Sequence, residues 1–157
     1  MDCAMNEYRI TKYDPKMRVD GLYLANDWTS ISDIGKKFPS GVLTLEQYTM
    51  VENRYISCCI ELLEKAGVSR LYIKQAEIYD AKIALPQYVA DKSSIGQVIR
   101  DCLREKYWAK LENTDFFIHF GYDYYMYVGT DLTASITDTI CKKHSLYCEK
   151  FRSPYHD

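Results

Sequence analysis

The chain has 157 residues, of which 47% are hydrophobic, 27% are charged and only 11 are Gly or Pro. This length fits one domain of ordinary size, and the composition excludes a disordered or fibrous protein. The 20 basic and 22 acidic side chains leave a formal net charge of -2, which argues against a general binder of nucleic acids or anionic membranes. We expect residues 1–157 to form a single α+β domain.

Neither a targeting signal nor a disulfide framework is expected. The N-terminal residues lack an apolar run of the length that a secretory signal needs, and charged residues interrupt every apolar stretch well before about 18 positions. The sequence therefore predicts a cytoplasmic protein whose six cysteines are reduced thiols. Met1 and Met5 both stay open as the native start.

The first part of the chain is predicted to contain a strand, a hairpin turn and two helices. Residues 7–13 alternate with the period of two that is typical of a strand. Asp20-Gly21 is a turn signal for the tip of a hairpin. A short helix is predicted over 31–37 and a long amphipathic helix over 45–66, opened by a capping box and closed by Gly67.

The rest of the chain predicts a mixed or mainly antiparallel sheet of about five strands with helices packed on one face, an α+β fold. The order of elements does not repeat a strict βαβ unit, which argues against a parallel sheet. The remaining elements are a strand over 70–80, a helix from a capping box at Ser94 and Gln97 to about Leu111, strands over 115–120 and 123–128 joined by a tight turn at Gly121-Tyr122, a helix over 134–144 and a strand over 146–151.

The sharpest compositional feature is an acidic, aromatic window over residues 111–141. It contains five acidic residues and no Lys or Arg, so it carries -5 whereas the rest of the chain carries +3. Tyrosine supplies contact area at low entropic cost, and carboxylates favour a basic partner, so we expect a protein-binding surface here. The candidate partner-binding residues are Asp115, Tyr122, Asp123, Tyr124, Tyr125, Tyr127 and Asp131, with Asp27, Trp28 and Asp33 as a second patch.

The same window also has a purely structural interpretation. One side of the hairpin would then be core, the other would be covered by a helix, and the Asp residues would serve turns and caps. Which face of the 115–128 hairpin is exposed stays open. Because the window lacks the basic residues that hold phosphates, it does not favour a nucleic-acid stacking platform. No cofactor and no membrane partner is expected.

The sequence also contains two weaker candidate chemical sites. His119 is the most interesting titratable residue for acid–base chemistry, although a histidine in a sheet more often simply packs. No nucleophile elbow, zinc-protease or nucleotide-binding motif is present. The conceivable partners of His119 are Asp115, Asp123 and Tyr125, and the weak metal-ligand candidates are Cys141, His144 and Cys148, with His156 or Cys3 as a fourth.

Three segments in about the first third of the chain resemble those of a set of small bacterial proteins. They are EYRITKYDPKMR, NDWTSISDIGKKF and LTLEQYTMVENRYI. Such proteins resemble the immunity proteins of polymorphic or contact-dependent toxin systems, which are small acidic cytoplasmic α+β proteins that occlude a toxin domain. The resemblance implies a non-enzymatic protein that binds a toxin domain, and it carries over no defined functional residue. The alternative is a small enzyme of unknown reaction that uses His119 as general acid and base with a nearby Asp or Tyr.

Overall fold

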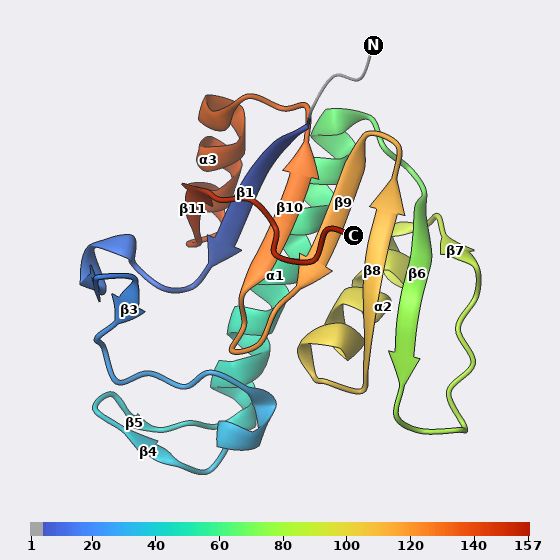
Figure 1. Cartoon of the computed structure of the whole chain (residues 1–157). Coiled ribbons are helices and arrows are strands. Elements are labelled where there is room, and N and C mark those ends of the chain that lie inside the picture. The colour runs from blue at the N-terminus through green and yellow to red at the C-terminus, as the bar shows by residue number, and fades with distance from the viewer. Residues whose placement is uncertain (1–4) are drawn as a thin grey trace.

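The fold is a large antiparallel sheet with all of its long helices on one face (Figure 1). The computed structural model describes residues 5–157, so Cys3 lies outside the described residues. The strands are β1 (Asn6–Thr11), β2 (Arg18–Val19), β3 (Leu22–Tyr23), β4 (Lys37–Phe38), β5 (Gly41–Val42), β6 (Leu71–Ile78), β7 (Tyr88–Val89), β8 (Tyr107–Asn113), β9 (Phe116–Phe120), β10 (Met126–Thr130) and β11 (Tyr147–Lys150). The helices are α1 (Leu45–Ala66), α2 (Lys92–Leu103) and α3 (Ala134–Lys143), with short 3₁₀ helices η1 (Pro15–Met17) and η2 (Ile31–Asp33).

The main sheet has the strand order β11-β1-β10-β9-β8-β6-β7, and every neighbouring pair is antiparallel. The α+β class is therefore confirmed, but the sheet has seven strands rather than about five. The two strands that sequence reasoning missed are the two-residue β7 and the longer β8. In Figure 1 the three α-helices lie behind the sheet, and the C-terminal segment crosses its front. Within residues 5–157, no helix has both the length and the apolarity to cross a membrane.

The long helix α1 begins and ends where its caps predict. The Thr44 hydroxyl accepts a hydrogen bond from the Gln47 N–H, and the Gln47 side chain accepts one from the Thr44 N–H. Gly67 follows the helix in the left-handed conformation, at φ 72°. The Asp20-Gly21 turn joins β2 to β3 as expected, whereas the helix predicted over 31–37 is only the 3₁₀ helix η2.

The prediction of one helix over 94–111 is wrong at both ends. Helix α2 begins after Asp91, whose carboxylate accepts hydrogen bonds from the Ser94 N–H and the Ser94 hydroxyl, both at 2.8 Å. The chain then turns and continues as β8. Tyr107 and Leu111, spaced four apart, fit one face of a helix and alternate positions of a strand equally well, so their periodicity could not separate the two.

Alternate residues of the central strands point to opposite faces of the sheet. Phe116, Ile118 and Phe120 of β9 join the core beneath the helices, while Phe117 and His119 point to the front. The Phe117 ring lies against the backbone of β10 at Gly129, where an added Cβ would be only 2.0 Å from a ring carbon. Glycine at this position is therefore required by packing.

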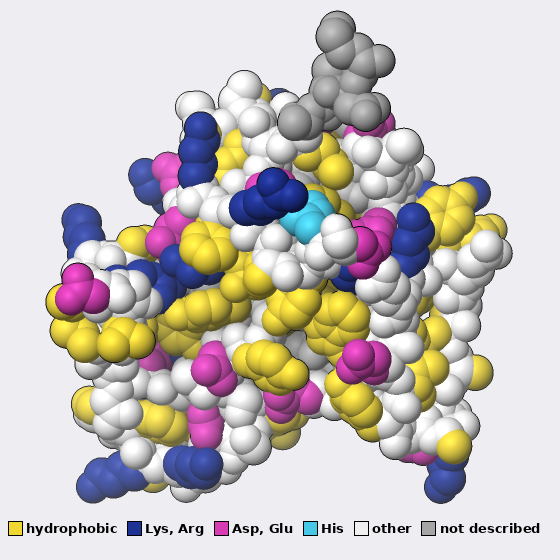
Figure 2. Space-filling view, in the orientation of Figure 1, with side chains coloured by type: hydrophobic (Ala, Val, Ile, Leu, Met, Phe, Trp, Pro, Cys, Tyr) yellow, Lys and Arg dark blue, Asp and Glu magenta, His cyan; other side chains and the backbone are white. Residues whose placement is uncertain are grey.

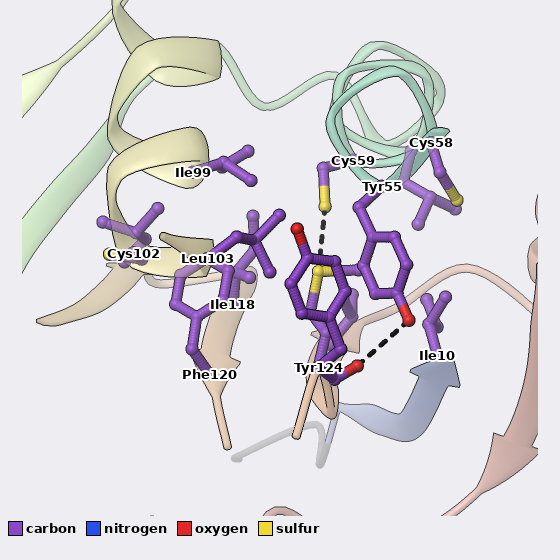
Figure 3. Packing of buried hydrophobic residues seen from close by; sticks show 14 of the residues in the cluster. Ile10, Tyr55, Cys58, Cys59, Ile99, Cys102, Leu103, Ile118, Phe120 and Tyr124 are labelled. Carbon is purple, nitrogen blue, oxygen red and sulfur yellow. Dashed lines mark hydrogen bonds between the residues drawn. The ribbon is translucent and has the colours of Figure 1, made fainter. Parts of the chain in front are cut away.

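Tyrosines form much of the core, which accounts for part of their excess in the composition. Tyr55 of α1 donates a hydrogen bond to the Tyr124 carbonyl at 3.0 Å and accepts one from the Lys12 N–H at 2.7 Å. Figure 3 shows Tyr55 and Tyr124 side by side between α1 and the strands. The Tyr48 and Tyr124 hydroxyls are 2.6 Å apart. Burial raises the pKa of these three tyrosines, so they remain protonated donors.

A buried carboxylate joins α1 to α2. Glu52, on α1, is completely buried and pairs with Arg100 and Arg104, which extend from α2 and its C-cap. Arg104 reaches both carboxylate oxygens, at 2.8 and 2.9 Å. The paired arginines supply the hydrogen bonds without which a buried charge would be strongly unfavourable.

Candidate functional site

The hairpin that the sequence marks as a binding surface is covered on both faces. Every residue of β9 and β10 is buried, beneath the helices on one face and beneath residues 151–157, here called the C-terminal tail, on the other. Tyr124 and Tyr127 are only 4% and 6% exposed, so the expectation that their rings are accessible is wrong. Tyr125 is half-buried and accepts a hydrogen bond from Arg18 at 2.8 Å. Tyr122, in contrast, is 82% exposed.

The position of Tyr122 follows from a strained turn between β9 and β10. Asp123 and Tyr124 have φ values of 60° and 67°, and the Tyr125 N–H bonds to the Tyr122 carbonyl at 3.2 Å, as in a type I′ turn. Glycine and asparagine normally occupy such positions because other side chains are strained there. The Tyr13 hydroxyl holds the turn by donating to the Asp123 carbonyl at 2.6 Å. The buried Tyr124 ring offsets the strain, and Tyr122 is left projecting into solvent.

The remaining predicted residues do not join this surface. Asp115 and Asp131 are exposed, but they lie at the opposite end of the hairpin, beyond the Phe116–Thr130 pair, so they cannot form a rim around Tyr122. Asp27 pairs with Lys12 at 2.7 Å.

The second predicted patch is structural. Trp28 is 8% exposed and packs against Tyr48 and Tyr124. Asp33 accepts hydrogen bonds from the Thr29 and Ser30 N–H groups, which lowers the pKa of its carboxyl despite the opposing effect of burial. Trp28 is therefore buried, and Asp27 and Asp33 are both engaged in contacts within the chain.

A cavity of about 290 Å³ opens beside Tyr122, where β6 and β9 end, β8 begins and the loop after α2 passes. Its walls include Tyr79, Trp108 and Tyr155, the last of which belongs to the C-terminal tail. The Trp108 indole N–H donates to the Phe120 carbonyl at 2.8 Å, which fixes the orientation of the ring. Figure 2 shows hydrophobic side chains gathered below the tail on this face, with acidic side chains beside them. We call this cavity the aromatic pocket.

The aromatic pocket carries negative charge. Glu77 and Glu105 line it, and no Lys, Arg or His is among its lining residues. Neither carboxylate forms an ion pair with any residue in 5–157, and neither does the nearby Asp123. Partial burial raises the pKa of Tyr79, and the two glutamates raise it further. The pocket thus combines aromatic surfaces with carboxylates that have no partner in the chain.

Glu105 reaches this position through an unusual helix terminus. It occupies the left-handed C′ position of α2 at φ 61°, and the Glu105 and Lys106 N–H groups bond to the Cys102 and Asp101 carbonyls in a Schellman motif. Helix α1 ends in the same motif with Gly67, the usual residue there. A glutamate at this position is unfavourable both for its backbone and for the negative end of the helix dipole.

His119 forms a second polar cluster on the front of the sheet. Its Nε2 lies 2.7 Å from a Glu112 carboxylate oxygen, and its Nδ1 lies 2.7 Å from the Ser153 hydroxyl. Because a carboxylate only accepts, Nε2 carries the proton and Nδ1 accepts from Ser153. Burial lowers the pKa of His119 more than Glu112 raises it, and Lys110 and His156 lower it further. The predicted Asp and Tyr partners are replaced by Glu112 and Ser153.

The C-terminal tail covers this cluster by crossing five strands in turn. The Phe151 N–H bonds to the Glu7 carbonyl of β1, and the Phe151 ring packs on Tyr127 of β10. Ser153 then contacts His119 of β9, and Asp157 reaches Lys110 of β8 and Gln75 of β6. Beneath the tail His119 has no exposed surface. The cluster therefore holds the tail in place and is closed to a substrate in this state.

The candidate metal ligands do not converge. Cys141 is buried beside Cys58, with the sulfur atoms 3.8 Å apart, whereas His144 bonds to Glu61 at 2.9 Å. Among residues 5–157 no group of three or more His, Cys, Asp or Glu side chains is arranged to hold a metal ion. The five described cysteines are free thiols.

Comparisons with protein-family models, with curated proteins and with solved structures gave no match. The function must therefore be argued from the geometry of this chain.

Sequence reasoning singled out Tyr122, which lines the aromatic pocket, and its neighbour Asp123, but not the other residues of the pocket. Glu77 lies near the end of β6, and Tyr79 directly follows that strand. Trp108 belongs to β8, which the sequence predicts as helix, and Tyr155 belongs to the tail. No local spacing relates these segments, so their convergence was not detectable. Glu105 carries no signal of a helix end because the glycine that usually marks one is absent.

Proposed function

We propose that this chain is a non-enzymatic, cytoplasmic immunity protein that binds and occludes a bacterial toxin domain with a basic surface. The observation that carries the proposal is the exposed ring of Tyr122 next to the carboxylates of Glu77, Glu105 and Asp123, none of which has an ion-pair partner in 5–157. The resemblance of the N-terminal segments to immunity proteins agrees with it.

The proposed mechanism is steric and electrostatic occlusion. Tyr122 would anchor the contact, because exposed aromatic rings that become buried contribute strongly to protein interfaces. The carboxylates would pair with Lys or Arg side chains that the toxin otherwise uses for phosphate, and an uncharged partner would leave them desolvated and unpaired. The site should therefore bind a basic partner more tightly than an uncharged one.

The proposal predicts a toxin gene beside this gene, and the test is binding to the product of that gene. Tyr122→Ala combined with Asp123→Asn should weaken the complex at least about tenfold in calorimetry and abolish protection in a co-expression growth assay. Asn suits the left-handed backbone at position 123, so folding is preserved. Tyr147→Ala, at an exposed tyrosine on the edge strand β11, is the matched control. Unchanged affinity in the double variant would remove the turn from the interface.

The second candidate function is an enzyme, and one observation favours it. Glu112, His119 and Ser153 form a continuous carboxylate–imidazole–hydroxyl array, the arrangement that activates a serine nucleophile elsewhere. Its burial under the tail argues against it. Labelling by a fluorophosphonate probe that is lost in Ser153→Ala would support an enzyme, whereas no labelling of the native chain would exclude this serine as a nucleophile.

A further inference from the structure

We propose that the aromatic pocket is a specific site for one arginine side chain of the partner protein. The inference rests on the proposed function and deepens it, because it names the group that the pocket receives. At about 290 Å³ the cavity lies at the lower end of the range for small-ligand sites, which suits a single side chain better than a larger ligand.

The walls of the pocket fit a flat cation. Tyr79 and Tyr122 are 65% and 82% exposed, so their ring faces are available at the mouth of the cavity. Trp108 and Tyr155, which are both half-buried, pack against each other with ring centroids 5.5 Å apart. A guanidinium stacks on aromatic faces and is attracted by their negative potential. The apolar stem of an arginine would lie along the same rings.

The charges of the pocket define the sign of the charge that its ligand should carry. Glu77 and Glu105 line the same cavity as Tyr79, and both add to the effect of burial in raising the pKa of its hydroxyl group. Since no basic residue lines the cavity, an anionic ligand would meet repulsion and a neutral one would leave the carboxylates without a partner. A guanidinium has five donors in a planar fork and can bond to carboxylates on two sides while stacked, which a compact, strongly hydrated ammonium does less well.

The backbone conformation at Glu105 does not require a glutamate side chain. The left-handed C′ position of α2 is one that glycine fills in α1, so the glutamate there is held at a conformational cost. No hydrogen bond or ion pair within residues 5–157 uses its carboxylate. The carboxylate therefore makes no polar contact in the described part of the chain, and Glu105 is among the residues that line the pocket.

The experiment is a titration of the whole chain with N-acetyl-arginine methylamide, observed by NMR. The chain contains two tryptophans, so the two indole N–H resonances report separately on Trp108 in the pocket and on Trp28 in the core. We expect the Trp108 resonance, assigned with Trp108→Phe, to shift with saturation while that of Trp28 stays in place. The citrulline analogue, which is similar in shape but uncharged, should bind at least about tenfold more weakly.

Two variants locate the binding. Glu105→Gln, which keeps the side-chain length and removes the charge, should weaken the arginine probe about tenfold. Tyr122→Ala should weaken it about threefold to tenfold. Tyr88→Ala, which removes an exposed tyrosine on the edge strand β7, should have no effect. Three results would overturn the arginine assignment. They are equal shifts with the citrulline probe, no saturation at Trp108, and tighter binding of the corresponding lysine or trimethyl-lysine probe.

Failure of this inference and failure of the proposed function give different results. If the toxin binds and is weakened by Tyr122→Ala with Asp123→Asn, but the arginine probe leaves Trp108 unchanged, the interface stands and the arginine pocket is wrong. If the arginine probe binds and the neighbouring toxin does not, the pocket stands and the immunity function is wrong. In the complex itself, one toxin arginine replaced by lysine should reproduce the loss seen with Glu105→Gln.

Discussion

Replacing Glu105 with glycine should stabilise the protein while it weakens the aromatic pocket. At φ 61° the glutamate has a conformation that costs an L-residue about 1–2 kcal/mol. Glycine avoids this cost but loses about 0.4–1 kcal/mol through the greater freedom of the unfolded chain. Removal of a negative charge from the C-terminal end of a helix raises the free energy of unfolding by about 0.3 kcal/mol at an exposed site.

The net expected gain is about 1 kcal/mol in the free energy of unfolding, or about 2–4 °C in Tm for a chain of this size. Urea unfolding followed by circular dichroism measures it. Glu105→Gln separates the two contributions, because glutamine keeps the backbone cost and removes only the charge. It should gain no more than a few tenths of a kcal/mol.

Helix α3 supplies the matched control. Ser145 occupies the same C′ position at φ 58°, with the Ser145 and Leu146 N–H groups bonded to the Lys142 and Cys141 carbonyls. Ser145→Gly should therefore give a similar gain in stability and leave binding of the arginine probe unchanged. If Ser145→Gly is stabilising and Glu105→Gly is not, then the glutamate contributes to the fold, and the argument that its side chain is retained for binding is refuted.

Three other predictions test the fold. Gly129→Ala should lower the free energy of unfolding by about 1–3 kcal/mol, because the new methyl group meets the Phe117 ring, and Phe117→Leu should restore part of the loss in a double-mutant urea series. Because burial lowers the pKa of His119 below its unfolded value near 6.5, the free energy of unfolding should fall as the pH drops from 7 toward 5. In urea unfolding, the stability of His119→Gln should depend less steeply on pH. Parallel plots of stability against pH for the native chain and the variant would contradict this. Arg104→Met should cost about 2 kcal/mol because it leaves the buried Glu52 with a single partner, and a loss below about 0.5 kcal/mol would show that the pair is not needed.

The elements that sequence could predict are those whose signals are local. The ends of α1 are specified by Thr44, Gln47 and Gly67, and all three act as predicted. The predicted start of α2 is wrong because Ser94 and Gln97 match a capping box, although Asp91 is the residue that caps the helix. Its end was missed because left-handed Glu105 does not look like a helix terminus.

The candidate site depends on contacts that no local pattern encodes. The exposed-ring prediction assumed that one face of the 115–128 hairpin meets solvent or a helix, whereas the C-terminal tail covers it through Ser153 and Tyr155. The charge window did lead to Tyr122, which is on the surface. Its acidic neighbours Glu77 and Glu105 lie outside that window, because they are brought to the turn by the pairing of β6 with β8 and by the end of α2.

The proposal predicts a toxin gene beside this gene, and the affinity of its product for the Glu77→Gln, Glu105→Gln double variant tests the central claim most directly. Both changes keep side-chain size and backbone, so they remove little except the negative charge that the pocket presents. If these carboxylates bind a basic group of the partner, Kd measured by calorimetry should rise at least about thirtyfold, and the salt dependence of binding should become weaker. A Kd within twofold of the native value, with unchanged salt dependence, would contradict the claim that this end of the sheet is the binding surface.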